Sequence, residues 1–243
     1  RRHTNSTSDT EMLLNVFATE LQAQLKNNKL SPEHIFNAIG CLHKRVEGSY
    51  SVIALLASHG LIAFRDPFGI RPLILGKRIS KNKKIDWICA SESLVLENND
   101  YQIVRDVKPG EAVFIDINGN IYSQQCFSNP KLFPCSFEYV YLARPDSIMN
   151  GISVYQARLR MGDRLAENIK RYLSAGEIDV VMPIPDSSRP AAMQVARQLG
   201  IEYREGFFKN RYVGRTFIMP GQLQRKKSVR QKLNAMGTEF KGK

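Results

Sequence analysis

The sequence lacks several features that would assign the protein to other classes. Its four cysteines are widely spaced and form no CxxC pattern, and its four histidines stand apart without metal-ligand spacing. These absences argue against a disulfide framework, a zinc site and a histidine-based catalytic triad. The longest apolar runs, such as residues 51–57, are too short to span a bilayer. We therefore expect reduced thiols in a cytoplasmic protein that does not enter a membrane.

Acidic residues are also missing over one long segment. No Asp or Glu occurs from Gly206 to Thr238, which we refer to as the basic stretch. The basic stretch contains eight cations: Lys209, Arg211, Arg215, Arg225, Lys226, Lys227, Arg230 and Lys232. The whole chain has a formal net charge of +12, and because uncompensated cations repel one another, an anionic partner is predicted. A phosphorylated small molecule, a nucleic acid and a merely solvated surface all remain open from charge alone.

The first half of the chain has the pattern of two helices followed by an antiparallel sheet. A Ser8-x-x-Glu11 capping box predicts a helix to about Leu25, and Ser31-Pro32 predicts the start of a second. Alternating and apolar runs predict strands over residues 51–58, 61–65, 73–76, 86–90 and 111–116. We also expect a hairpin turn at Asn118-Gly119.

The second half has a different rhythm, which predicts an α/β sheet. The expected order is a helix over 154–173, a buried parallel strand over 178–184, a helix over 191–199 that ends at Gly200, and a strand over 201–208. Turn-forming residues at 128–134 indicate the boundary between the halves. We therefore predict an α+β domain over residues 1–131 and part of an α/β domain over residues 132–243.

The loop over 185–190 is a candidate phosphate site because it follows a buried strand and opens a helix. Ser187 and Ser188 supply hydroxyl groups there, and Asp186 could orient a metal ion or a ribose hydroxyl. Ordinary capping of the helix by these side chains is the simpler interpretation of the loop taken alone.

Two other motifs leave alternatives open. Asp9 can pair with the ammonium group of a substrate, or it can cap the first helix. The segment Arg65 to Pro72 is expected to be a structural turn braced by an Arg–Asp pair. The glycine-containing loop from Lys209 to Gly221 suits closure over a phosphorylated small molecule.

Six motifs in order along essentially the whole chain resemble glutamine phosphoribosylpyrophosphate amidotransferase. They are Ser49 to Val52, Ala63 to Leu73, Ala90 to Ser93, Arg105 to Ala112, Phe137 to Ser147 and Lys209 to Gly221. The resemblance implies an N-terminal-nucleophile glutaminase domain followed by a type I phosphoribosyltransferase domain. It also implies the first committed step of de novo purine synthesis, in which ammonia from glutamine converts phosphoribosyl pyrophosphate to 5-phosphoribosylamine.

The resemblance also implies roles for individual residues. Asp9 would hold the α-ammonium of glutamine, and Tyr141 would lie near the ammonia channel. The loop over residues 185–190, the pyrophosphate loop of the family, would bind substrate through Asp186 and Ser188. Ser187 would lie beside pyrophosphate and Mg²⁺. The flexible loop would close over the sugar phosphate with Lys209, Tyr212 and Arg215. Purine nucleotide inhibitors would use the pyrophosphate loop together with Lys209, and the parent protein is expected to be a homo-oligomer.

The sequence departs from the family pattern at both ends. The family's nucleophilic cysteine and its acidic phosphoribosyl pyrophosphate signature are expected outside residues 1–243, so we expect an internal fragment that is inactive by itself. An iron–sulfur cluster is left open, because Cys135 matches one ligand region and the others would follow Lys243. The alternatives are a catalytically dead paralogue that senses nucleotides or acts as a scaffold, and a nucleic-acid-binding protein, although no repeated aromatic motif supports the latter.

Overall fold

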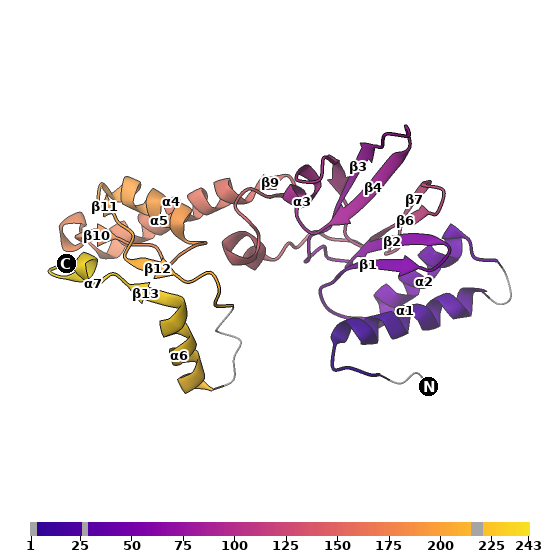
Figure 1. The fold of residues 1–243 in the computed structure, drawn as a ribbon, viewed down its shortest axis with the longest axis horizontal. Helices are drawn as coiled ribbons and strands as arrows, with labels where there is room; N and C mark the ends of the chain where they lie inside the picture. Colours follow the sequence, from indigo (N-terminus) through magenta and orange to yellow (C-terminus); the bar gives the residue numbers. More distant parts are fainter. Residues whose placement is uncertain (1–3, 26–28, 215–220) are drawn as a thin grey trace. The chain divides into compact units, whose positions relative to one another are not determined.

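The computed structural model describes residues 4–25, 29–214 and 221–243, and the chain divides into two compact units (Figure 1). The first unit comprises Arg1–Ser136 and Ser147–Gly151, and the second comprises Phe137–Asp146 and Ile152–Lys243. These are units of packing. The assignment of one domain to residues 1–131 and another to residues 132–243 stays a prediction.

The first unit begins with the two predicted helices, α1 (Asp9–Leu25) and α2 (Pro32–Arg45). Ser31 is the N-cap of α2: its hydroxyl accepts a hydrogen bond from the backbone N–H of His34 at 3.5 Å, and the His34 ring bonds back to Ser31. The buried side of α2 carries Ile35, Phe36, Ile39 and Leu42, as the helical spacing predicts.

The start of α1 differs from the capping box that the sequence predicts. The carboxylate of Glu11 does not serve Ser8; it accepts hydrogen bonds from the backbone N–H groups of Asn5 at 2.7 Å and Ser6 at 2.8 Å, and from the Ser6 hydroxyl at 2.6 Å. The Ser8 N–H donates to the Ser6 hydroxyl at 3.3 Å. The chain before α1 therefore folds back over the first turn, which brings three donors within reach of one carboxylate.

Two antiparallel sheets follow the helices. The four-stranded sheet has the order β1 (Ser51–Leu56), β2 (Gly60–Arg65), β6 (Glu111–Asp116) and β7 (Ile121–Gln125). The three-stranded sheet has the order β4 (Ile85–Ala90), β3 (Ile74–Ile79) and β5 (Gln102–Asp106). The short helix α3 (Ser93–Glu97) and strand β8 (Ile148–Met149) complete the unit. The strands predicted in this half are confirmed, whereas the sequence pattern did not predict β5 or α3.

Apolar side chains cover both faces of the four-stranded sheet. Ile62 and Phe64 point to one face, where they pack with Phe17 of α1 and Ile39 of α2. Ala63, between them on β2, points to the other face and packs in a second cluster with residues of the three-stranded sheet. The first unit is therefore layered as helices, sheet and sheet.

The turn after β2 is structural, as predicted, and its bracing bonds run to the backbone. The buried guanidinium of Arg65 donates to the carbonyl oxygens of Arg71 at 2.6 Å, Gly69 at 2.7 Å and Val107 at 2.9 Å. The buried carboxylate of Asp66 accepts from three backbone N–H groups, those of Phe68, Ile70 and Arg71. Backbone groups that a tight turn would leave unpaired are thus satisfied by two adjacent side chains.

The second unit is built around α4 (Val154–Tyr172) and α5 (Arg189–Leu199). Its other elements, in chain order, are η1 (Glu138–Leu142), β9 (Ile152–Ser153), η2 (Ala175–Glu177), β10 (Val180–Val181), β11 (Glu202–Tyr203), β12 (Phe207–Lys209), α6 (Gln222–Lys232), β13 (Leu233–Ala235) and α7 (Gly237–Phe240). Arg158 of α4 is buried and donates to the carbonyl oxygens of Tyr139 at 2.8 Å and Ala143 at 2.7 Å. These bonds tie α4 to η1.

The predicted strands of this unit are present but shorter than expected. β10 pairs in parallel with β11, as predicted, and Gly200 ends α5 in the left-handed conformation with φ 68°. The strand expected over 178–184 has two residues, because Pro183 and Pro185 follow and have no N–H for a sheet ladder. The strand expected over 201–208 is divided between β11 and β12, and β12 pairs antiparallel with β13.

Candidate functional site

The loop between β10 and α5 does not use its serine to cap the helix. Ser188 is the N-cap residue of α5, yet its hydroxyl donates to the carbonyl oxygen of Ile184 and makes no capping bond. Ser187 is half-buried in the same loop, and the peptide bond between Pro185 and Asp186 is cis. The capping interpretation of Ser188 is therefore wrong. The backbone N–H of Arg189 donates to the carbonyl oxygen of Asp186 at 3.3 Å, and Pro190 has no N–H, so the loop itself uses the first amide of α5.

Asp186 lies between two cations. Its Oδ2 is 2.6 Å from the ammonium of Lys209, and its Oδ1 is 3.0 Å from an Nη atom of Arg189. Burial acts to raise the pKa of Asp186, but the hydrogen bond from Lys209 and the charges of Lys209, Arg189 and Arg211 lower it below its ordinary value. Asp186 is thus a carboxylate at neutral pH, and the structure brings it together with Lys209 although 23 positions separate them in sequence.

Arg189 extends this contact to two further residues. Its Nε is 2.9 Å from Glu205 Oε1 and its second Nη is 3.4 Å from Glu205 Oε2, while the Tyr203 hydroxyl donates to Glu205 Oε1 at 2.8 Å. The hydrogen bond with Glu205 is the main cause that raises the pKa of Arg189. Burial, followed by the bond to Glu205, raises the pKa of Tyr203 to about 12. We call the five linked side chains, Tyr203, Glu205, Arg189, Asp186 and Lys209, the charged network.

Three members of the charged network were not predicted as site residues. Arg189, Tyr203 and Glu205 reach the site from the first turn of α5, from β11 and from the segment after it. Two signals were available: Glu205 is the last acid before the basic stretch, and Arg189 follows Asp186 at the i,i+3 spacing of an ion pair.

The arrangement suits an anionic ligand. The two carboxylates of the charged network balance the charges of Lys209 and Arg189, whereas the nearby Arg211 is not balanced by an ion pair within the described part of the chain. Asp186 and Arg189 lie at the N-terminal end of α5, where the helix dipole favours a negative charge. Side chains that are only partly buried can exchange an internal partner for a phosphate oxygen.

The other residues predicted for this site are placed differently. Tyr212 lies in the turn after β12 with a fully exposed side chain, and its N–H donates to Asn210 Oδ1 at 3.0 Å. Arg215 lies outside the described residues. Tyr141 is half-buried in η1, with its ring 5.3 Å from the ring of Phe137. The structure therefore places Lys209 in the charged network but not Tyr212 or Tyr141.

Asp9 belongs to the first unit. It is the first residue of α1, its side chain is exposed, and its Oδ1 accepts a long hydrogen bond of 3.4 Å from the Thr10 hydroxyl. An exposed carboxylate at a helix start can either cap the helix or receive a ligand ammonium, so its role stays a prediction.

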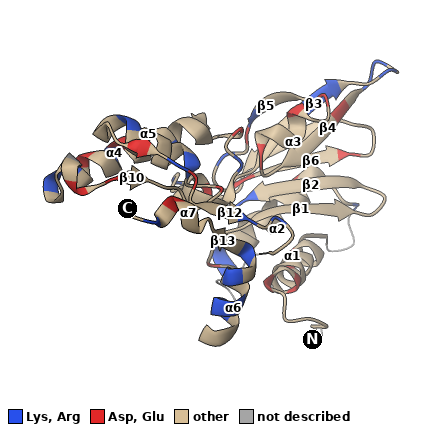
Figure 2. Ribbon diagram, turned by 60° about the vertical axis from the view of Figure 1, so that its left-hand side comes forward, with Lys and Arg blue, Asp and Glu red and all other residues tan. Residues whose placement is uncertain are grey.

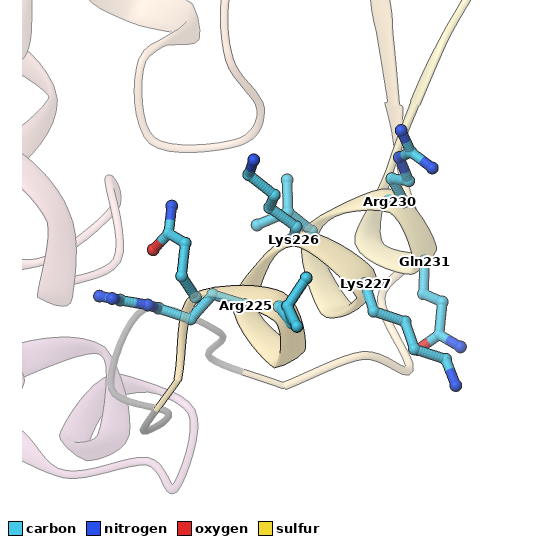
Figure 3. A pocket seen from close by; sticks show the side chains of 8 residues that line it. Arg225, Lys226, Lys227, Arg230 and Gln231 are labelled. Carbon is cyan, nitrogen blue, oxygen red and sulfur yellow. The ribbon is translucent and has the colours of Figure 1, made fainter.

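Helix α6 carries much of the charge of the basic stretch but builds no enclosed site. A surface hollow along it is lined only by residues of α6 itself: Gln222, Leu223, Arg225, Lys226, Lys227, Val229, Arg230 and Gln231. The labelled cations project in several directions around the helix (Figure 3), and no acidic residue occurs on it (Figure 2). One helix cannot surround a ligand, so α6 offers an exposed cationic surface and no binding pocket.

Thiols and metal ligands are not gathered into a centre. All four cysteines are free, and burial raises the pKa of Cys89 to about 11 and of Cys126 to about 12, which keeps both protonated at neutral pH. Within residues 4–25, 29–214 and 221–243, no three or more His, Cys, Asp or Glu side chains are grouped to hold a metal ion. No helix in the same residues has the length and apolar composition to cross a membrane.

Comparisons with known proteins agree along the whole chain. The sequence is 56% identical over 244 residues to an amidophosphoribosyltransferase of Pseudomonas aeruginosa, and 51% and 50% identical to those of Escherichia coli and Saccharomyces cerevisiae. Each match covers all of this chain and 48% of the relative, so the chain spans about half the length of the curated relatives it matches. No protein-family profile matches the chain.

The fold gives the same answer. The chain superimposes with a TM-score of 0.72 and 34% identity on the Bacillus subtilis glutamine phosphoribosylpyrophosphate amidotransferase complexed with ADP and GMP. The match covers 97% of this chain and 47% of that one. The fold class predicted from sequence is therefore confirmed: antiparallel sheets packed with helices, followed by the first part of a parallel-sheet unit.

Proposed function

The chain belongs to the amidophosphoribosyltransferase family, and we propose that it supplies part of both sites of such an enzyme. The proposed reaction is the first committed step of purine synthesis: glutamine and phosphoribosyl pyrophosphate give 5-phosphoribosylamine, glutamate and pyrophosphate. The observation that carries the proposal is the charged network at the N-terminus of α5, where Asp186, Arg189 and Lys209 converge from separate elements.

We assign the pyrophosphate group of the substrate to this end of α5. Negative charge grows on pyrophosphate as its bond to the sugar breaks, and cations fixed beforehand stabilise that charge. Lys209 is the cation best placed to do so, because its ammonium already lies 2.6 Å from a carboxylate oxygen and can transfer to a phosphate oxygen. Arg189 is the second cation at the same place.

The oxygen donors of the loop fit Mg²⁺, which prefers carboxylate, hydroxyl, water and phosphate oxygens. Asp186 and Ser187 would hold the ion, and two of the four acceptor positions of the Asp186 carboxylate remain after Lys209 and Arg189 are bound. When bound, Mg²⁺ supplies additional positive charge for the pyrophosphate oxygens. An iron–sulfur cluster stays open, with Cys135 as a half-buried thiol of the first unit.

The remaining sequence predictions complete the proposal. Asp9 holds the ammonium of glutamine, Ser188 contacts the substrate from the N-cap of α5, and Tyr141 lines the path of ammonia. Lys209, Tyr212 and Arg215 belong to the loop that covers the sugar phosphate. Purine nucleotides compete for the phosphate site, in line with the ADP and GMP complex of the Bacillus subtilis relative. Homo-oligomers and a cytoplasmic location are expected.

The test compares glutamine-dependent and ammonia-dependent formation of phosphoribosylamine by the complete gene product, of which these 243 residues are all or part. Lys209→Gln should raise the Michaelis constant for phosphoribosyl pyrophosphate with either nitrogen source. Lys170→Gln is a matched control, because this lysine lies on α4 and is not part of the charged network. A wild-type protein that makes no phosphoribosylamine but binds nucleotides would favour the dead paralogue, and tight RNA binding unaffected by phosphoribosyl pyrophosphate would favour the nucleic-acid alternative.

A further inference from the structure

Glu205 occupies a particular place in the charged network. It is the residue through which Tyr203 and Arg189 are joined, and it accepts three hydrogen bonds. We propose that Glu205 is a positioning residue of the pyrophosphate site, which acts through Arg189 and does not touch the ligand. This inference rests on the function proposed above and adds a residue to it.

The geometry of Arg189 carries the inference. Its Nε and one Nη face the two oxygens of Glu205 at 2.9 and 3.4 Å, and the other Nη faces Asp186 at 3.0 Å. A guanidinium is planar and rigid, so a two-point contact on one edge fixes the direction of the remaining N–H groups. Glu205 therefore determines where Arg189 meets Asp186.

The orientation of Asp186 then affects Lys209. The carboxylate takes Arg189 on one oxygen and Lys209 on the other, so each cation has its own oxygen. If Arg189 were released from Glu205, its fork could turn onto both oxygens of Asp186 and displace Lys209 from its place. The two cations would then no longer be held on separate oxygens of one carboxylate.

Tyr203 orients Glu205 in turn. Its hydroxyl donates to Glu205 Oε1, the same oxygen that receives Arg189 Nε, from the end of β11. β11 pairs in parallel with β10, the strand that leads into the loop of Asp186. The side chains of the loop are therefore held in place by a hydrogen-bonded chain that starts on β11, the strand paired with β10.

Two opposite effects are expected when Glu205 is changed, and they can be separated. Removal of its negative charge makes the site more attractive to an anion, whereas loss of positioning makes it less so. Arg189→Lys keeps the charge and removes only the fork. Glu202→Gln is the matched control for charge, because Glu202 lies three residues earlier, carries an exposed ion pair with Arg204 at 2.9 Å and stands outside the charged network.

The experiment measures steady-state kinetics of the complete gene product with ammonia as the nitrogen source, and calorimetric binding of inorganic pyrophosphate. Glu205→Gln and Arg189→Lys should each raise the Michaelis constant for phosphoribosyl pyrophosphate roughly three- to tenfold. Because the two residues act together, the Michaelis constant of the double variant should not exceed that of the more impaired single variant. Pyrophosphate affinity should fall by the same factor. Glu202→Gln should stay within about twofold of wild type.

Other results would overturn the inference. A fall in the Michaelis constant for Glu205→Gln would show that charge, not position, dominates. A loss of turnover number at unchanged Michaelis constant would show that Glu205 only stabilises the fold. If wild type neither turns over phosphoribosyl pyrophosphate nor binds pyrophosphate, the proposed function fails, and this inference with it. If wild type does both and the variants match the Glu202→Gln control, only the inference fails.

Discussion

Replacing Arg65 by Met should lower the free energy of unfolding of the first unit and leave the Michaelis constants of the complete gene product unchanged. Arg65 is 1% exposed and lies in one of the motifs on which the sequence resemblance rests, so its loss could be taken for a catalytic defect. In the structure its guanidinium bonds the carbonyl oxygens of Gly69, Arg71 and Val107 and the side-chain oxygen of Asn150 at 3.1 Å.

The size of the effect follows from these partners. The contacts with the carbonyl oxygens of Gly69 and Val107 are buried and that with Arg71 is half-buried, and each carbonyl left without its donor costs about 1–3 kcal/mol when buried. The substitution also removes the desolvation penalty of the buried guanidinium, which is several kcal/mol. The net loss in the free energy of unfolding is the difference between these two terms and should be on the order of a few kcal/mol.

Denaturant unfolding followed by tryptophan fluorescence measures this loss directly. Trp87 is the single tryptophan, and it lies in β4 of the first unit with its ring N–H bonded to the carbonyl of Gly119 at 3.1 Å. Arg78→Met is the matched control, since Arg78 is 43% exposed and its pair with Asp86 is worth about 1 kcal/mol or less. A loss for Arg65→Met no larger than the control, or a changed Michaelis constant in the folded fraction, would refute the structural role.

Three further predictions concern other groups. Asp9→Asn should raise the Michaelis constant for glutamine by about 10- to 150-fold, the loss of one charge-assisted bond of about 1.5–3 kcal/mol, and should spare the ammonia-dependent reaction; equal loss in both assays would show that Asp9 only caps α1. Burial lowers the pKa of His43 to about 4. Between pH 6.5 and pH 4 the unfolded state therefore binds a proton on this imidazole that the folded state does not bind. Stability should then fall by about 3 kcal/mol between pH 6.5 and pH 4, and unfolding curves of His43→Leu should lack that part of the slope. Cys89 and Cys126, with pKa values of about 11 and 12, should react with iodoacetamide at pH 7.5 much more slowly than a free thiol, and labelling at the rate of glutathione would contradict their burial.

The sequence predicted the elements whose signals are local. Helices α2 and α4 were found because their apolar residues recur at helical spacing, and Ser31 with Pro32 marked the start of α2. Strand β5 was missed because its side chains show no alternation of buried and exposed positions. Strand β10 was predicted too long because apolar character alone does not show where a sheet partner ends.

The site was predictable only in part, for the same reason. Asp186 and Lys209 were identified from motif and charge, each within its own segment. Asp186 and Lys209 are 23 positions apart, and Arg189 and Glu205 are 16 apart. The packing of α5 against β11 helps to bring these positions together. No period or spacing in the sequence indicates that packing, so Glu205 was not predicted as a site residue.

The way the chain is shared between the two units has a practical consequence. Residues 137–146 belong to the second unit, but residues 147–151 return to the first before the chain leaves again. The backbone therefore passes from one unit to the other three times, and no single cut separates them. A protease nick or a gene truncation at any one of these crossings leaves a segment of one unit attached to the other. Expressing either unit without residues of the other therefore requires a second cut or a permuted linkage.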